Sequence, residues 1–334
     1  CYGTKEQFIT FTHKTLYKKL LKEYGVPVVD EYELADNFSE NDTENIEYPV
    51  LVKPSDGSGS RGVRVCRNYS ELKEGYEYAK KWSKCNEVIV EKYLTGDEID
   101  CFWAFENGEP YLTALASWHK KSYYEGVNAM GVAYTYPSVY LSDYEKTVAP
   151  KAKKMFKDLG LKEGCLFMQC FIDGGIAKCY DIGFRLTGSM ENEILRKVCG
   201  FDPMEMMIDY AIFGSSGEQL KEKVNPHFGN LYGWNISFLM KPGKIAKIEG
   251  YEEVLKSTGV INAFLDKAVG DEILESEKGQ LKQMVLRVLG CSDSKENIKR
   301  DMQKVFEIFK VYDENGNNLL MPPVDISEYY DLID

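Results

Sequence analysis

The alternation of apolar and polar positions predicts short strands and amphipathic helices that follow one another along the whole chain. A first helix is predicted over 15–24, where Leu16, Leu20 and Leu21 share one face and lysines occupy the other. Gly25 ends this helix. A short strand is expected over 26–32.

A compact unit follows, with a buried strand, a glycine-rich loop, a second strand, a helix and a third strand. The strands are predicted over 48–53, 63–66 and 88–90, and the loop covers 55–62. Ser70 is expected to cap the helix, which runs for about a dozen residues.

Two hairpins and several helices are predicted in the middle of the chain. Asn107-Gly108 joins strands at 99–105 and 110–118, because this dipeptide favours a tight hairpin turn. A second hairpin pairs 164–172 with 176–182. The other predicted elements are helices over 143–159, 190–198 and 203–213.

After Gly229 the sequence pattern changes, and we expect a separate α+β tail domain. Its β-like segments are short and are separated by glycine and proline. The expected elements are strands at 234–240, 244–248 and 260–265, a helix at 295–309 and a last strand at 310–312.

Composition indicates a globular protein and excludes several classes. The chain has 334 residues, 44% of them hydrophobic and 28% charged, which is enough for two or three lobes around a core. The net charge of -12 argues against a broadly basic nucleic-acid surface. No apolar run approaches the roughly 20 residues that a bilayer span needs, so we expect no membrane partner.

Cysteine and histidine usage bears on compartment and metal chemistry. Nine cysteines without a CxxC pair favour free thiols in a reducing compartment, so a cytoplasmic location is expected. The three histidines, His13, His119 and His227, lie far apart in sequence and argue against a His-rich zinc site.

The most informative motif is VLVKPSDGSGSRGVRV, residues 50–65. A buried strand would deliver Lys53 to a loop in which Gly57, Gly59 and Gly62 let backbone N–H groups approach phosphate oxygens. The spacing is neither a Walker loop nor a dinucleotide fingerprint. An exposed hairpin beside a snorkelling lysine explains the motif equally well, so both interpretations stay open.

The second motif is IVEKYLTGDEID, residues 89–100. The end of a strand would leave backbone groups of 91–94 available to an adenine edge. Glu91 can accept a hydrogen bond from an exocyclic amine, and Glu98 can bind a ribose diol. An acidic surface hairpin is the better interpretation of this segment alone.

The third motif is FMQCFIDGGIAKCYDIGFRLTGS, residues 167–189. Gln169 and Asp181 lie on the two arms of one predicted hairpin and can project from the same face, an oxygen pair that suits Mg²⁺. Arg185 follows in a loop and can hold a carboxylate or an acyl phosphate. The alternative is a structural pair between Asp181 and Arg185.

In this order, the three motifs resemble ATP-grasp enzymes over roughly residues 10–320. The similarity is greatest to the branch with the carbamoyl-phosphate synthase large subunit, biotin carboxylase and amino-acid ligases. It implies an α+β fold in which two lobes sandwich ATP, with a β-rich C-terminal domain. The implied divisions are a leading segment (1–47), a lid lobe (48–96), a palm lobe with a metal site (97–228) and a C-terminal α+β domain (229–334).

The resemblance also implies site residues. ATP would be bound by Lys14, Lys53, Ser58, Gly59, Ser60, Gly62, Glu91, Tyr93, Leu94 and Glu98. Gln169 and Asp181 would bind Mg²⁺, with Mn²⁺ as the alternative ion. Arg185 would be the catalytic arginine.

Two departures from the family pattern stand out. The second metal motif of the family is Glu-x-Asn-Pro-Arg, whereas this chain has Asp181-Ile182-Gly183-Phe184-Arg185. The aspartate is shorter by one methylene, and the glycine removes a ligand. Members of the branch also carry an α/β domain of about a hundred residues ahead of the lysine segment. We expect that domain to come from a missing segment or from another chain.

The implied function is that of an ADP-forming ligase that activates a carboxylate as an acyl phosphate for attack by an amine, forming a C–N bond. Its partners would be a small-molecule carboxylate and an amine. One alternative is carboxyphosphate chemistry of the carbamoyl-phosphate synthase or biotin carboxylase kind. Another is a non-catalytic ATP-binding subunit, which Gly183 favours.

Overall fold

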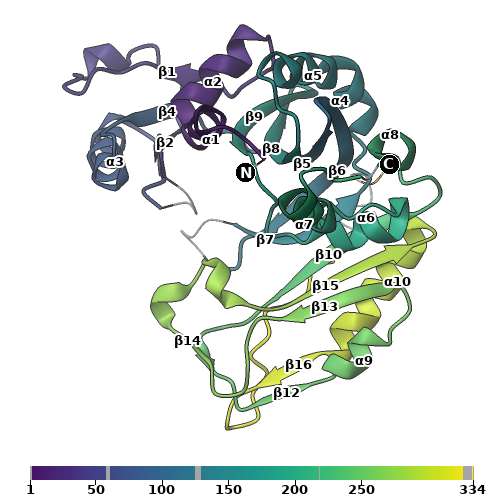
Figure 1. Ribbon diagram of the computed structural model, residues 1–334. Coiled ribbons are helices and arrows are strands. Elements are labelled where there is room, and N and C mark those ends of the chain that lie inside the picture. The colour runs from purple at the N-terminus through teal and green to yellow at the C-terminus, as the bar shows by residue number, and fades with distance from the viewer. Residues whose placement is uncertain (1, 58–60, 125–128, 218, 326–332, 334) are drawn as a thin grey trace.

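A computed structural model describes residues 2–57, 61–124, 129–217, 219–325 and 333 (Figure 1). The strands are β1 (Glu31–Tyr32), β2 (Val50–Pro54), β3 (Arg64–Cys66), β4 (Val88–Lys92), β5 (Glu98–Glu106), β6 (Glu109–Lys121), β7 (Met130–Tyr136), β8 (Gly164–Asp173), β9 (Ile176–Gly183), β10 (Tyr232–Leu239), β11 (Gly243–Lys244), β12 (Lys247–Glu249), β13 (Val260–Leu265), β14 (Glu272–Ile273), β15 (Met284–Ser292) and β16 (Lys310–Tyr312). The α-helices are α1 (Lys5–Thr12), α2 (Lys14–Glu23), α3 (Tyr69–Trp82), α4 (Leu141–Thr147), α5 (Ala149–Asp158), α6 (Glu191–Cys199), α7 (Pro203–Phe213), α8 (Leu220–Lys223), α9 (Tyr251–Leu255) and α10 (Lys295–Ile308).

A four-stranded sheet in the order β1-β4-β2-β3, with α3 packed against it, forms a small lobe that contains the residues predicted for the lid (Figure 1). Val50 and Val52 of β2 and Leu72 and Ala79 of α3 are fully buried in one cluster. The predicted unit of strand, loop, strand, helix and strand is therefore confirmed. Its apolar positions form the core between sheet and helix because they recur with the period of each element.

The predicted cap of α3 is wrong by two residues. Asn68, and not Ser70, precedes the helix, and its side chain accepts a hydrogen bond from the backbone N–H of Glu71. Asn68 has an extended backbone, with φ -159° and ψ 174°, which is the conformation of an N-cap residue. Both residue types can cap a helix, so composition alone did not separate them.

A large sheet of eight strands runs in the order β13-β15-β10-β7-β6-β5-β8-β9. Its β5 strand is buried on both faces: Cys101, Trp103 and Phe105 belong to one apolar cluster, and Phe102 and Ala104 belong to another. The first cluster includes residues of α4 and α5, and the second includes residues of α6 and α7. Helices on both faces explain why β5 reads as a continuous apolar run.

Both predicted hairpins are present. The turn between β5 and β6 places Asn107 at φ 52° and Gly108 at φ 84°. The turn between β8 and β9 places Gly174 at φ 58° and Gly175 at φ 78°. These left-handed conformations are the ones that glycine and asparagine tolerate, which is why the two turns could be predicted from sequence.

The helix expected over 143–159 is broken in two, into α4 and α5. Pro150 lies in the first turn of α5, where its missing N–H costs nothing. Val148 separates the two helices and is fully buried. Proline inside one continuous helix would have removed a backbone hydrogen bond, so the chain starts a new helix there.

The C-terminal residues have a core of their own but share the large sheet. Trp234, Val288 and Val305 are fully buried in a cluster that also includes residues of α9 and α10. Strand β10 nevertheless pairs with β7, in the register Trp234↔Thr135, so the sheet runs across the predicted boundary at 229. Neither β7 nor β15 was predicted. The domain limits themselves stay predictions.

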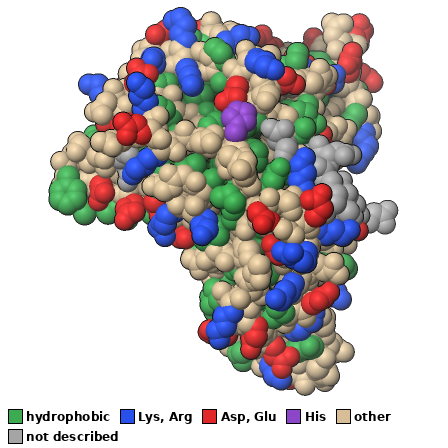
Figure 2. Space-filling model, turned by 90° about the vertical axis from the view of Figure 1, so that its right-hand side faces the viewer, with side chains coloured by type: hydrophobic (Ala, Val, Ile, Leu, Met, Phe, Trp, Pro, Cys, Tyr) green, Lys and Arg blue, Asp and Glu red, His purple; other side chains and the backbone are tan. Residues whose placement is uncertain are grey.

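Charged side chains of both signs are interspersed over the face shown in Figure 2. Within the described residues, no helix combines the length and the apolar character that crossing a bilayer requires.

Gly290→Ala is expected to destabilise the large sheet. A Cβ at Gly290 would lie 2.0 Å from Cε2 of Trp234, which is fully buried and donates from Nε1 to Ser292 Oγ at 3.0 Å. The indole cannot move away without losing packing, so the free energy of unfolding should fall by about 1–3 kcal/mol in chemical denaturation. Gly188→Ala is the matched control, since no atom lies within 4 Å of a Cβ there. Equal midpoints for the two variants would contradict the packing argument.

Candidate functional site

A buried carboxylate joins two buried lysines where the lid meets α2. Glu91 of β4 binds Lys53 of β2 through Oε1 at 2.6 Å and Lys18 of α2 through Oε2 at 2.5 Å. The exposed fractions are 2% for Glu91, 4% for Lys53 and 1% for Lys18. Lys18 also binds Glu31 of β1 at 2.9 Å. These three buried residues and the half-buried Glu31 form one charge network.

Opposing charges keep this network ionised despite its burial. Burial raises the pKa of Glu91, but Lys53 and Lys18 outweigh burial and hold that pKa below its ordinary value. Burial lowers the pKa of Lys18, yet Glu91 and Glu31 raise it above normal. The pKa of Lys53 stays lowered, since burial and the nearby Lys18 act in the same direction.

Lys53 also reaches from the lid to the palm strand β9. Its Nζ donates to the carbonyl oxygen of Tyr180 at 3.4 Å and lies 5.9 Å from the centre of the Tyr180 ring. Asp181 is the next residue along β9. The first and third sequence motifs are therefore neighbours in space.

The predicted Lys14 lies at the base of the glycine-rich loop. Its Nζ donates to the carbonyl oxygen of Gly57 at 2.6 Å, and its backbone N–H donates to Ser55 O at 2.9 Å. Gly62 has φ +76°, and a Cβ there would lie 2.8 Å from Cβ of Trp82, so only glycine fits. Ser58, Gly59 and Ser60 lie outside the described residues.

The predicted adenine and ribose positions lie at the junction of lid and palm. Tyr93 donates its backbone N–H to Pro49 O at 3.2 Å, while Leu94 is half-buried. Glu98 is 6% exposed and accepts hydrogen bonds from Lys120 and from Tyr180 OH, the latter at 2.8 Å. The Glu98 carboxylate is thus held by the two side chains on its own sheet.

The palm carries a row of polar side chains across three adjacent strands. Gln169 of β8 lies opposite Asp100 of β5 and opposite Asp181 of β9. Directly opposite residues project from the same face of a sheet, so the three side chains lie together, as predicted for Gln169 and Asp181. Gln169 Nε2 donates to both carboxylate oxygens of Asp100, at 3.1 and 3.3 Å.

The arrangement of this row suits a hard cation. The Gln169 amide gives its N–H to Asp100, which leaves Oε1 as a free acceptor. Asp181 is half-buried and accepts from Tyr17 OH at 3.2 Å, and among the described side chains no lysine, arginine or histidine forms an ion pair with it. A partly buried carboxylate without a cationic partner fits Mg²⁺, which binds oxygen ligands.

Gly183 is explained by packing. A Cβ at Gly183 would lie 2.5 Å from Cε1 of the Phe167 ring, so a side chain has no room there. Arg185 lies beyond it with its guanidinium 4.9 Å from the centre of the same ring, and it donates to Leu186 O at 2.7 Å. In the described part of the chain Arg185 makes no ion pair with Asp181, so the alternative of a structural pair is wrong.

Two buried residues of this region were missed. Lys18 was placed with the lysines of the solvent face of its helix, but it lies one turn after Lys14 and is fully buried. Asp100 lies two residues after Glu98, on the same face of β5. Burial raises the pKa of Asp100 to about 7, although the hydrogen bond from Gln169 acts to lower it. In both cases the sequence held a signal: each missed residue is spaced so that it shares a face of its helix or strand with a predicted site residue.

Part of the chain matches a family of known proteins in sequence. Residues 20–166 match the family model of the D-ala D-ala ligase C-terminus. D-alanine–D-alanine ligase A of Bacillus cereus is 36% identical over 90 residues, which are 26% of this chain and 29% of the relative. D-alanine–D-alanine ligase of Francisella tularensis subsp. tularensis is 32% identical over 148 residues, 44% of this chain and 48% of the relative. The matched region thus spans less than half of either relative.

Solved structures match nearly the whole fold. L-amino acid ligase from Bacillus licheniformis has a TM-score of 0.71 at 17% identity, and the alignment covers 92% of this chain and 73% of the ligase chain. The biotin carboxylase domain of Hydrogenobacter thermophilus 2-oxoglutarate carboxylase, solved with MgADP, ADP and bicarbonate, has a TM-score of 0.73 at 19% identity, covering 94% of this chain and 68% of its own. Phosphoribosylglycinamide synthetase from Anaerococcus prevotii has a TM-score of 0.70 at 16% identity, covering 93% and 76%. The chain therefore has the ATP-grasp fold that these solved structures share.

Proposed function

We propose that this chain is the ATP-grasp part of an ADP-forming ligase that joins a carboxylate to an amine. The observation that carries the proposal is the contact between lid and palm at Lys53 and Tyr180. It brings a buried ammonium group next to the oxygen row of Gln169 and Asp181. The sequence match to D-alanine–D-alanine ligases supports the ligase class.

In this proposal the lid binds the triphosphate of ATP. Lys14 binds the Gly57 carbonyl oxygen of the glycine-rich loop, and Lys53 lies near the end of the strand that precedes this loop. Their charges would offset those of the phosphates. Lys18 holds Glu91 from the other side, so Lys53 can turn toward a phosphate without leaving the buried carboxylate unpaired. Loop residues Ser58 to Gly62 would add backbone N–H groups. The segment from Glu91 to Leu94 and the Glu98 carboxylate would hold the adenosine.

The palm would hold the divalent ion through Gln169 and Asp181. Mg²⁺, or Mn²⁺ in its place, would neutralise phosphate charge when bound. Asp100 orients the Gln169 amide, because it accepts the amide N–H groups and leaves the carbonyl oxygen for the ion. Tyr17 fixes the Asp181 carboxylate from α2.

Arg185 is placed to bind the activated carboxylate. Its guanidinium is exposed and lies just past the end of β9, beyond the oxygen row. It stacks on Phe167, which limits its rotamers and lowers the entropy lost when an anion binds. The substrate carboxylate would attack the γ-phosphate, and an amine would then displace phosphate from the acyl phosphate. Arg185 would hold the acyl phosphate throughout.

The reaction class is tested by measuring ADP formation from MgATP with D-alanine, with pairs of L-amino acids, and with bicarbonate alone. A ligase should form ADP only when an amino acid supplies the carboxylate and an amine is present. ADP release with bicarbonate alone would replace the proposal by carboxyphosphate chemistry. Tight ATP binding without turnover in any mixture would identify a binding-only subunit instead.

Lys53→Met should weaken nucleotide binding at least about tenfold, equivalent to about 1.4 kcal/mol, because a charge-assisted contact to phosphate is lost. Methionine keeps most of the buried volume, and Lys18 still pairs with Glu91, so the fold should persist. Isothermal titration with ATP gives the affinity. The control is Lys157→Met on α5, whose ammonium pairs with Glu109 at 2.7 Å on the surface. Equal affinity for Lys53→Met and wild type would remove Lys53 from the site.

Arg185→Ala should leave nucleotide affinity within about twofold and lower turnover by about a hundredfold, because the residue acts on the acyl phosphate and not on ATP. The comparison of titration calorimetry with steady-state ADP release separates the two effects. Arg67→Ala is the matched control, since Arg67 is exposed and takes part only in a surface pair with Glu71. Unchanged turnover in Arg185→Ala would show that its role is structural.

A further inference from the structure

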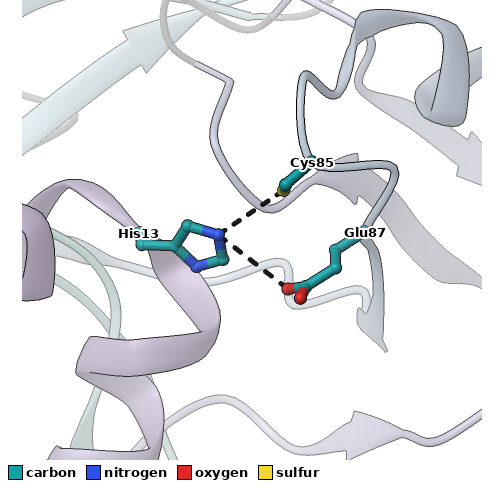
Figure 3. A group of neighbouring side chains, drawn as sticks. All are labelled: His13, Cys85 and Glu87. Carbon is teal, nitrogen blue, oxygen red and sulfur yellow. Dashed lines mark hydrogen bonds and ion pairs between the residues drawn. The ribbon is translucent and has the colours of Figure 1, made fainter.

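Three side chains with different metal-binding atoms converge away from the oxygen row. Figure 3 shows His13, Cys85 and Glu87 facing one another. His13 is the residue between α1 and α2, whereas Cys85 and Glu87 come from the loop that joins α3 to β4. The group therefore connects the N-terminal helices to the lid lobe.

The spacing of the three ligand atoms is close to that of a tetrahedral metal site. His13 Nε2 lies 3.5 Å from Cys85 Sγ and 3.9 Å from Glu87 Oε2, and all three ligand atoms lie within 4.8 Å of one another. Zinc bonds of about 2.0–2.3 Å at tetrahedral angles separate ligand atoms by roughly 3.3–3.8 Å. Shifts of a few tenths of an ångström to about one ångström would close the site around an ion.

Hydrogen bonding within the group does not by itself account for this arrangement. One ring nitrogen can donate a single hydrogen, yet Nε2 faces both a thiol and a carboxylate. The 3.9 Å to Glu87 Oε2 is too long for a hydrogen bond. The other ring nitrogen, Nδ1, is buried and has no hydrogen-bond partner in the described structure, which leaves Nε2 as the accessible ligand atom. One divalent ion would satisfy all three groups together.

Neighbouring side chains already hold two of the ligands. The hydroxyl oxygens of Ser55 and Ser83 lie 3.1 and 3.3 Å from Cys85 Sγ and can donate to a thiolate. Thr15 Oγ1 donates to Glu87 Oε2 at 3.1 Å. Such outer contacts orient ligands and strengthen metal binding.

We propose that His13, Cys85 and Glu87 bind one Zn²⁺ ion, with a water as the fourth ligand. The thiolate and the carboxylate would neutralise its charge, and binding would release the thiol proton. Nitrogen and sulfur ligands select zinc over magnesium, so this site differs in chemistry from the oxygen row on the palm. The proposed site uses a single histidine, so it is compatible with the prediction that the chain has no His-rich zinc site.

Zinc binding here would fix the base of the glycine-rich loop. Ser55 donates its backbone N–H to Glu87 O at 3.1 Å and accepts from Lys14 N–H at 2.9 Å. Two residues further, Gly57 O binds the Lys14 ammonium. An ion that joins His13 to Cys85 and Glu87 would therefore clamp the segments on both sides of Ser55. The site itself does not depend on the proposed ligase activity.

Cobalt titration of the nucleotide-free full chain tests the site, because a Co²⁺–thiolate bond gives a charge-transfer band in the near ultraviolet. One equivalent of Co²⁺ should produce this band, Zn²⁺ should abolish it, and a large excess of Mg²⁺ should leave it unchanged. Cys85→Ser should lose the band. Cys199→Ser is the matched control and should keep it, since Cys199 lies on α6 and contacts the Asn225 carbonyl.

Two further variants separate ligation from folding. Glu87→Gln should keep the band but lower Co²⁺ affinity at least about tenfold. Zn²⁺ should slow alkylation of the exposed Cys85 thiol in wild type, read by mass spectrometry, and His13→Ala should abolish that protection. Circular dichroism checks that each variant is folded. A band that persists in Cys85→Ser, or no band in folded wild type, would overturn the proposal.

Discussion

The buried carboxylate of Glu91 is the contact on which the arrangement of lid and N-terminal helix depends. Its two oxygens bind ammonium groups from two different elements, β2 and α2. A buried charge that loses its partner costs several kcal/mol, so neither lysine can leave unless the other stays. The network therefore fixes α2 against the lid while it leaves one ammonium group free to exchange its partner for an anion.

The palm provides the rigid side of the site. Strand β5 lies inside an eight-stranded sheet and is covered by apolar clusters on both faces. Asp100, Gln169 and Asp181 are set in this sheet by register, and register cannot slip without moving buried residues to the wrong face. The oxygen row is therefore held more firmly than a site built on loops.

The two candidate ion sites differ in position and in ligand type. The oxygen row faces Lys53 from the palm, whereas His13, Cys85 and Glu87 hold the segment that leads into the glycine-rich loop. Hard oxygen ligands and mixed nitrogen and sulfur ligands select different ions. The structure thus separates a site suited to charge neutralisation from one suited to fastening the lid.

The sequence by itself determined the local elements and the residue types of the site. Turn dipeptides such as Asn107-Gly108 and the apolar periods of the helices are local signals, so they placed both hairpins and helices such as α3 and α10. The break between α4 and α5 was not predicted. The positions of Gln169 and Asp181 on one hairpin predicted that their side chains project from the same face, because side-chain direction in a strand alternates with a period of two.

Tertiary structure alone decided the long-range partners. The buried position of Lys18, the place of β15 in the shared sheet, and the meeting of His13 with Cys85 depend on which distant segments pack together. The pattern of polar residues along α2 predicts that Lys18 faces solvent. Lys18 is buried instead because it pairs with the buried carboxylate of Glu91, a contact between distant residues that the pattern does not reveal. Contacts between distant residues leave no periodic signal in the chain.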